Sequence, residues 1–276
     1  MSSMRQLIPI AFQVTSNVAP DLSAKVACEL FLRPRRLPLS TREREILQQA
    51  QTETLQSSRR VYFWGENVQD PLVAFVHGWE SRGSAFHKWI PLLIENGFRV
   101  MGWDGPAHGE SPGVRTTAPD IAQALAADLS ELNVPLHGVV GHSLGGVVVG
   151  LLSRHISLPQ KVVIVSAPSR ISGVFSRYND QIRLSRAARA RFQRMIERET
   201  GITAEEGSLI NQKIPELAET LLIHDVDDRE VPFSDFQELR QAWDQARALA
   251  TQGLGHRRIL RDLSVGHEIT EFLKSS

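Results

Sequence analysis

Residues 136–152, LHGVVGHSLGGVVVGLL, decide the fold class of this chain of 276 amino acids. A short apolar run is broken by GHSLG at 141–145, and a second apolar run with two further glycines follows. This pattern is typical of a buried strand, a sharp turn and a helix, and the turn matches the G-x-S-x-G elbow. A serine on so tight a turn has a strained backbone, and side chains two residues to either side would collide with the adjacent strand and helix. The elbow is therefore expected to hold the hydroxyl of Ser143 clear of the sheet.

Strands and helices alternate along most of the chain on either side of the elbow. Apolar runs of strand length are separated by amphipathic helical patterns such as the one at 84–96, which ends at Gly97. The other predicted strands are 61–64, 72–76, 98–103, 161–166, 220–224 and 247–251. The sequence therefore predicts the α/β class, with a mostly parallel central sheet and helices on both faces.

Two helical segments lie outside this alternation. Amphipathic helices are predicted at 21–32 and 41–55, the second with a capping box formed by Ser40 and Glu43. An arginine-rich helical stretch interrupts the later strands. The predicted division is an N-terminal helical extension at 1–58, a core at 59–168 and 219–276, and a helical cap inserted at 169–218.

The unusual residues of the core follow the carboxyl ends of predicted strands, where parallel sheets bind ligands. A serine hydroxyl needs a base to take its proton, and that base needs a partner to orient it. After the elbow serine, acidic residues at 225–228 follow a strand, and His256 lies on a glycine-flanked loop after the last strand. The chain therefore carries serine, aspartate and histidine in an order suited to nucleophilic catalysis.

Five motifs together resemble the α/β-hydrolase fold superfamily, in its branch of esterases and thioesterases with a serine nucleophile. The resemblance runs from about Val61 to the C-terminus, except for the cap. The motifs are HGWE at 77–80, DGPAHGES at 104–111, GHSLGG at 141–146, HDVDDREVP at 224–232 and GLGH at 253–256. It implies Ser143 as the nucleophile and His256 as the general base and acid.

The acid that would pair with His256 is one of three aspartates, and the resemblance favours one of them. HDVDDREVP is similar to the family pattern H-G-x-x-D-x-x-V-P, which implies Asp228. This sequence has Asp225 where the family usually has glycine, so Asp225 and Asp227 remain alternatives.

Two backbone N–H groups are expected to hold the negative charge that develops on the substrate oxygen. The elbow supplies the N–H of Leu144, the residue after the nucleophile. The resemblance implies the N–H of Trp79 as the second donor. It also implies that His77 and His108 shape loops, so neither is expected to act as the base.

Composition narrows the classes of protein. The 31 basic and 31 acidic residues balance, which gives no electrostatic case for nucleic acid or an anionic membrane. Cys28 is the only cysteine, so no internal disulfide is expected. The apolar run near the N-terminus is short and contains Pro9, so we expect neither a signal peptide nor a spanning helix, and cytoplasmic localisation. Neither a metal nor a cofactor is expected, because the His and carboxylate spacings do not match ligand motifs.

The function expected from these features is cleavage of an ester or thioester bond in a small molecule through a Ser-His-Asp triad and an acyl-enzyme. A C–C bond hydrolase or a peptidase would use the same triad. A small-molecule receptor on an intact hydrolase fold is the alternative of another class. The arginines of the cap could receive an anionic substrate, but a solvated helix face is favoured. The sequence does not predict the oligomeric state.

Overall fold

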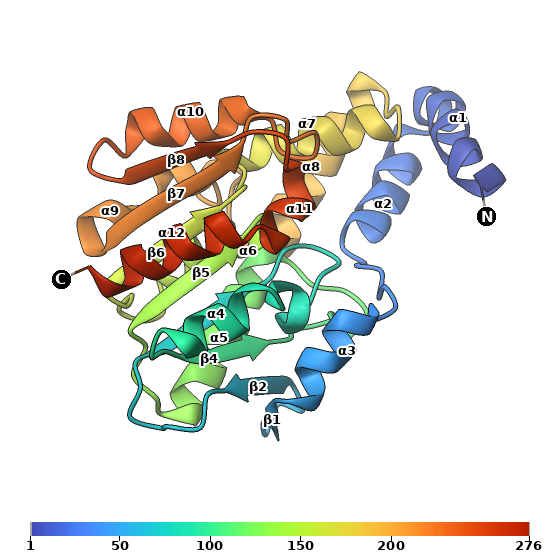
Figure 1. The fold of residues 1–276 in the computed structure, drawn as a ribbon. Helices are drawn as coiled ribbons and strands as arrows, with labels where there is room; N and C mark the ends of the chain where they lie inside the picture. Colours follow the sequence, from blue (N-terminus) through green and yellow to red (C-terminus); the bar gives the residue numbers. More distant parts are fainter. Residues whose placement is uncertain (1, 276) are drawn as a thin grey trace.

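A computed structural model describes residues 2–275, so Met1 and Ser276, which end the predicted extension and core, lie outside the described residues. One eight-stranded sheet runs through the molecule in the order β1-β2-β4-β3-β5-β6-β7-β8 (Figure 1). Strands from β4 across to β8 pair in parallel, whereas β1 and β2 are antiparallel. The strands are β1 Gln51–Thr54, β2 Arg60–Trp64, β3 Leu72–Val76, β4 Arg99–Trp103, β5 Gly138–His142, β6 Lys161–Val165, β7 Glu219–Asp225 and β8 Arg247–Thr251.

Helices cover both faces of the sheet because the central strands are apolar on both sides. In β3, Leu72, Ala74 and Val76 enter one apolar cluster, and Val73 and Phe75 enter the other. Successive side chains of a strand point to opposite faces, so the unbroken apolar run supplies two cores. One face carries α5 Ala118–Leu132, α6 Leu144–Leu152 and α10 Phe233–Ala242; the other carries α4 Trp89–Glu95 and α12 Leu263–Lys274.

The N-terminal helices pack against the cap helices and share an apolar cluster with them. Figure 1 shows α1 and α2 beside α7 and α8, on the side of the molecule where the parallel strands end. Ala24 and Ala27 of α2 are fully buried there, close to Phe192 of α8. The helices are α1 Ser2–Val18, α2 Pro20–Phe31, α7 Ile171–Gln181 and α8 Arg186–Thr200. The first two helices of the chain and the cap helices thus form one helical layer, whereas α3 (Thr41–Gln48) and β1 pack with the core.

Two predicted helices are wrong in their extent. The helix predicted at 41–55 ends early as α3 Thr41–Gln48, and the residues after it form β1. The capping box of Ser40 and Glu43 is confirmed. Strand β1 gains its backbone partners from β2, and that tertiary pairing overrides the local helical preference.

The helix predicted at 84–96 is divided into a 3₁₀ turn, η1 Gly83–Phe86, and α4. Pro91 favours a helix that begins at Trp89, because in the first turn its missing N–H costs no hydrogen bond within the helix. The remaining short elements are η2 Leu209–Asn211, α9 Ile214–Leu217, α11 Gly255–Arg258 and η3 Ile259–Arg261. Within the described part of the chain, none of the helices is both long enough and apolar enough to cross a bilayer.

Candidate active site

The elbow between β5 and α6 has the strained geometry that its sequence predicts. Ser143 has φ 55° and ψ −121°, a conformation that L-residues rarely adopt. A Cβ atom on Gly141 would lie 2.6 Å from the carbonyl oxygen of Gly145, and one on Gly145 would lie 2.1 Å from that of Val76. Only glycine fits at either position, so the predicted steric reason for the two glycines is confirmed.

A continuous hydrogen-bonded chain joins Ser143, His256 and Asp228. Nε2 of His256 lies 3.0 Å from Oγ of Ser143, and Nδ1 of the same ring lies 2.7 Å from Oδ2 of Asp228. His256 and Asp228 are buried, and they come from α11 and from the loop that follows β7. The structure therefore brings together the three side chains that the sequence selected, although Ser143 and His256 are 113 residues apart in the chain.

The carboxylate of Asp228 is held in its charged form. Its Oδ1 accepts hydrogen bonds from the backbone N–H groups of Glu230 (2.8 Å) and Val231 (2.9 Å), which leaves Oδ2 for His256. Burial alone raises the pKa of this carboxyl group. The hydrogen bond and charge of His256 and the two N–H donors outweigh burial, so the pKa of Asp228 lies below its usual value.

The two other acids of this loop contact backbone instead of the histidine ring. Asp225 accepts hydrogen bonds from the Thr251 hydroxyl (2.7 Å) and from the N–H groups of Leu254 (3.0 Å) and Gly255 (2.8 Å). Asp227 accepts a hydrogen bond from the N–H of Gly253 (2.9 Å). These bonds fasten the segment that presents the histidine to the end of β7. Among the three acids, it is the side chain of Asp228 that lies beside the ring.

The two residues expected to supply the N–H donors line the cavity of the serine. Leu144 is the first residue of α6. The N–H groups of the first turn of a helix have no acceptor within the helix, so the N–H of Leu144 is free to bind a substrate oxygen. Trp79 follows Gly78, whose added Cβ would lie 3.0 Å from Cβ of Ser143. Trp79 and Leu144 both line the same cavity as the serine.

Three further histidines near the serine are buried and neutral. Burial lowers the pKa of His77 to about 4, and burial together with the adjacent ring of His77 lowers that of His108 to about 3. His77 accepts a hydrogen bond from the N–H of Gly105 (3.0 Å) at Nε2 and donates one from Nδ1 to Gly78 O (2.8 Å). It thereby joins the loops after β3 and β4.

His142, inside the elbow, contacts the backbone of His256. Its Nε2 donates a hydrogen bond to the backbone carbonyl of His256 (2.9 Å), and the two rings lie 4.8 Å apart. Burial and the charge of that ring lower the pKa of His142 to about 3. This contact could not be predicted from the sequence, because it joins residues 114 apart in the chain.

A cavity of about 1270 Å³ opens onto Ser143. The sheet side of its wall holds Trp79, Leu144 and His256, and the cap contributes residues of α7. Residues of α2, including Phe31, complete the wall. The N-terminal extension therefore borders the candidate site, which the sequence did not predict.

Four arginines of the cap form ion pairs. Arg191 contacts Asp21 of α2 at 2.6 Å, and Arg189 contacts Asp180 at 2.5 Å. Arg177 lines the cavity, but it lies 3.3 Å from a carboxylate oxygen of the buried Asp235.

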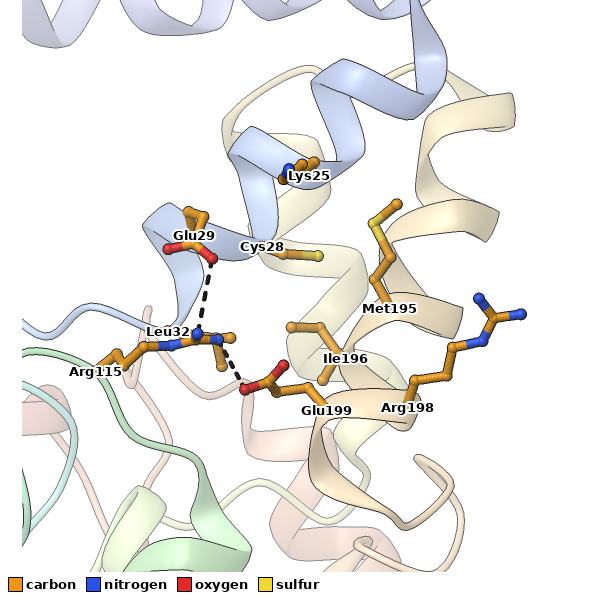
Figure 2. Close-up of a pocket in the computed structure, with 9 residues that line it drawn as sticks. All are labelled: Lys25, Cys28, Glu29, Leu32, Arg115, Met195, Ile196, Arg198 and Glu199. Atoms are coloured by element: carbon orange, nitrogen blue, oxygen red, sulfur yellow. Dashed lines mark hydrogen bonds and ion pairs between the residues drawn. The ribbon is translucent and has the colours of Figure 1, made fainter.

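A second cavity of about 300 Å³ lies between α2 and α8, as Figure 2 shows. Its wall includes Cys28 and Met195. Burial, with the charges of Glu29 and Glu199, raises the pKa of Cys28 to about 12. The sulfur therefore stays a thiol, which is a poor nucleophile and metal ligand. Among residues 2–275, no group of three or more His, Cys, Asp or Glu side chains could hold a metal ion.

Comparisons with known proteins identify the family. The sequence profile of the alpha/beta hydrolase family matches residues 73–265, which is more than half of the chain. This chain belongs to the alpha/beta hydrolase family.

Individual relatives match only part of the chain. A human serine hydrolase-like protein is 29% identical over 110 residues, which is 38% of this chain and 53% of the relative. The non-heme chloroperoxidase CPO-A1 of Kitasatospora aureofaciens is 32% identical over 98 residues, 34% of this chain and 32% of that protein. The matches thus span about half or less of the length of these relatives. An esterase of Pyrococcus furiosus has a similar fold, with a TM-score of 0.64 and 19% identity over 88% of this chain and 97% of the esterase.

Proposed function

We propose that this chain is a serine hydrolase that cleaves an ester or thioester bond of a small molecule. The observation that carries the proposal is the hydrogen-bonded chain from Ser143 through His256 to the buried Asp228. A strained serine with a paired histidine on one side and helix N–H groups on the other has the parts needed for acyl transfer.

In the proposed reaction, Nε2 of His256 takes the proton of Ser143 as Oγ attacks the acyl carbonyl carbon. Asp228 holds the ring in the tautomer that leaves Nε2 free to accept, and it stabilises the imidazolium that forms. The N–H groups of Leu144 and Trp79 donate to the carbonyl oxygen as it gains negative charge.

The protonated ring then gives its proton to the leaving alcohol or thiol, and an acyl-enzyme remains on Ser143. Water enters, loses a proton to Nε2 of His256 and attacks the acyl carbon. The second tetrahedral intermediate collapses, the acid leaves, and the serine regains its proton. The cap at 169–218, in this proposal, encloses the acyl group and the extension at 1–58 stands beside it.

Labelling with a fluorophosphonate tests the proposal, because this probe reacts with a serine that a base activates and an oxyanion site assists. We expect stoichiometric modification, located at Ser143 by intact mass and peptide mapping. The Ser143→Ala variant should take up no probe and lose ester hydrolysis while its thermal unfolding stays that of the wild type. A folded wild-type chain that neither reacts with the probe nor hydrolyses esters contradicts the proposal and favours a binding protein on a hydrolase fold.

A further inference from the structure

Phe31, near the C-terminal end of α2, is a half-buried residue in the wall of the cavity that holds Ser143. Its ring lies nearly parallel to that of Trp79, with an interplanar angle of 20° and centroids 6.5 Å apart. Trp79 supplies one of the two proposed oxyanion donors. Phe31 therefore stands next to the place where the carbonyl group of a substrate would lie.

Two aromatic residues of α7 continue this wall. The ring of Phe31 lies 4.9 Å from that of Tyr178 and 5.7 Å from that of Phe175, and both of these residues line the cavity. The hydroxyl of Tyr178 donates a hydrogen bond to the carbonyl of Ala27 (2.8 Å), so its polar atom is satisfied outside the cavity. The three rings thus offer apolar surface from two segments more than a hundred residues apart.

Helix α2 is fastened so that this wall keeps its place. Figure 2 shows Arg115 between Glu29 of α2 and Glu199 of α8, at 3.9 and 2.9 Å. The N–H of Thr116, in the same core segment, donates to the carbonyl of Leu32 (3.0 Å). One short stretch of the core therefore holds both the extension and the cap.

Charged residues line the cavity near the histidine. The leaving group must lie within reach of Nε2 of His256, because that atom returns the proton. Arg257, the residue after this histidine, lines the cavity and pairs with Glu230 at 2.8 Å, and Arg229 lines the cavity as well. The aromatic wall lies by Trp79, on the oxyanion side.

We propose that Phe31, Phe175 and Tyr178 form the acyl-binding subsite, and that the substrate joins an extended apolar acyl group to a polar leaving group. An apolar chain laid against three rings would lose its contact with water, whereas a polar leaving group would keep solvated, charged neighbours. This inference rests on the proposed function and adds α2 to the substrate site.

A series of p-nitrophenyl esters with acetyl, butanoyl, hexanoyl and octanoyl groups tests the subsite. We expect kcat/KM of the wild type to rise from the acetyl to the longer esters. Phe31→Ala should lower the ratio of octanoyl to acetyl kcat/KM about tenfold, because part of the apolar wall is lost. Phe31→Trp should lower the same ratio by filling the space. Leu22→Ala, an exposed site on the same helix, is the control and should leave the ratio unchanged.

Fluorophosphonate labelling of each variant separates this inference from the proposed function. If Ser143 is labelled and the acetyl ester is hydrolysed, but the octanoyl to acetyl ratio is the same in wild type, Phe31→Ala and Phe31→Trp, the subsite is wrong and the hydrolase proposal stands. If no variant, nor the wild type, is labelled or active on any ester, the hydrolase proposal fails and the subsite fails with it.

Discussion

Asp225, Asp227 and Asp228 lie within four residues at the end of β7, and their hydrogen-bond partners separate their roles. The carboxylate of Asp228 contacts the ring of His256, whereas those of Asp225 and Asp227 contact the backbone that precedes the ring. Loss of a ring contact affects proton transfer. Loss of a loop contact affects stability and the position of the loop.

Asp228→Asn should therefore lower kcat of ester hydrolysis about a thousandfold or more, because the amide no longer favours the required tautomer or stabilises the imidazolium. Asp225→Asn should lower kcat far less and reduce the free energy of unfolding by about 1–3 kcal/mol, because three backbone N–H groups lose a charged acceptor. Steady-state kinetics and urea unfolding of both variants measure these effects. If Asp225→Asn gave the larger loss in kcat, the assignment of Asp228 would be wrong.

The residues that could be predicted from the sequence are those with a local signature. Ser143 has its glycines within two residues, and His256 follows a glycine pair in the last loop. Phe31 and Arg115 have no such signature, because their partners lie on distant segments. A proposed backbone donor such as the N–H of Trp79 has no side-chain signature, so only the family resemblance indicated it.

At the scale of elements, the elbow depends on how closely α6 approaches the end of β3. A Cβ on Gly145 would lie 2.1 Å from the carbonyl oxygen of Val76 and 2.8 Å from that of His77. Both are backbone atoms, which cannot move aside as the tip of a side chain can. The helix would have to shift, and its first N–H groups would shift with it.

Gly145→Ala should therefore lower the free energy of unfolding by about 3 kcal/mol or more and abolish fluorophosphonate labelling. Gly173→Ala in α7 is the matched control, because the added Cβ would meet only the flexible end of Arg177, at 3.3 Å. That change should be neutral or stabilise the protein by up to about 1 kcal/mol. Equal stability of the two variants in urea unfolding would refute the steric account of the elbow.

Elements with their own periodicity could be predicted, and those that depend on distant partners could not. The strands predicted at 72–76 and 247–251 coincide with β3 Leu72–Val76 and β8 Arg247–Thr251. Strand β1 was missed because its residues, QTET, are exposed and polar, and their pairing with β2 is the only structural signal. The packing of α2 on α8 could not be predicted either, since each amphipathic face gives no indication of its partner.

At the scale of the whole molecule, buried histidines join the loops at the carboxyl ends of the strands, and three of them surround the elbow. His77, His108 and His142 are each less than a tenth exposed, and each bonds to backbone. Their pKa values lie at about 4, 3 and 3, well below the ordinary value of 6.5. Protonation of these rings would place charge in the layer that holds the elbow.

The fold should therefore lose stability as the pH falls from 7 to 5. These rings take up protons in the unfolded chain near pH 6.5 but stay neutral in the folded chain until about pH 3–4. Their stabilising effect is fully present above pH 6.5 and is lost below it, at about 2 kcal/mol for each ring by pH 5. Asp104, whose pKa burial raises, acts in the opposite direction, but one carboxyl group cannot cancel three histidines.

Urea unfolding of the wild type at pH 7 and pH 5, beside His108→Asn and His155→Asn, measures this dependence. The difference in unfolding free energy between the two pH values should shrink by about 2 kcal/mol in His108→Asn, because one buried ring no longer takes up a proton on unfolding. It should keep its wild-type size in His155→Asn, because that ring is exposed in both states. A difference that is equal in all three proteins would mean that His108 does not resist protonation in the folded chain, and that the acid sensitivity of the fold has another source.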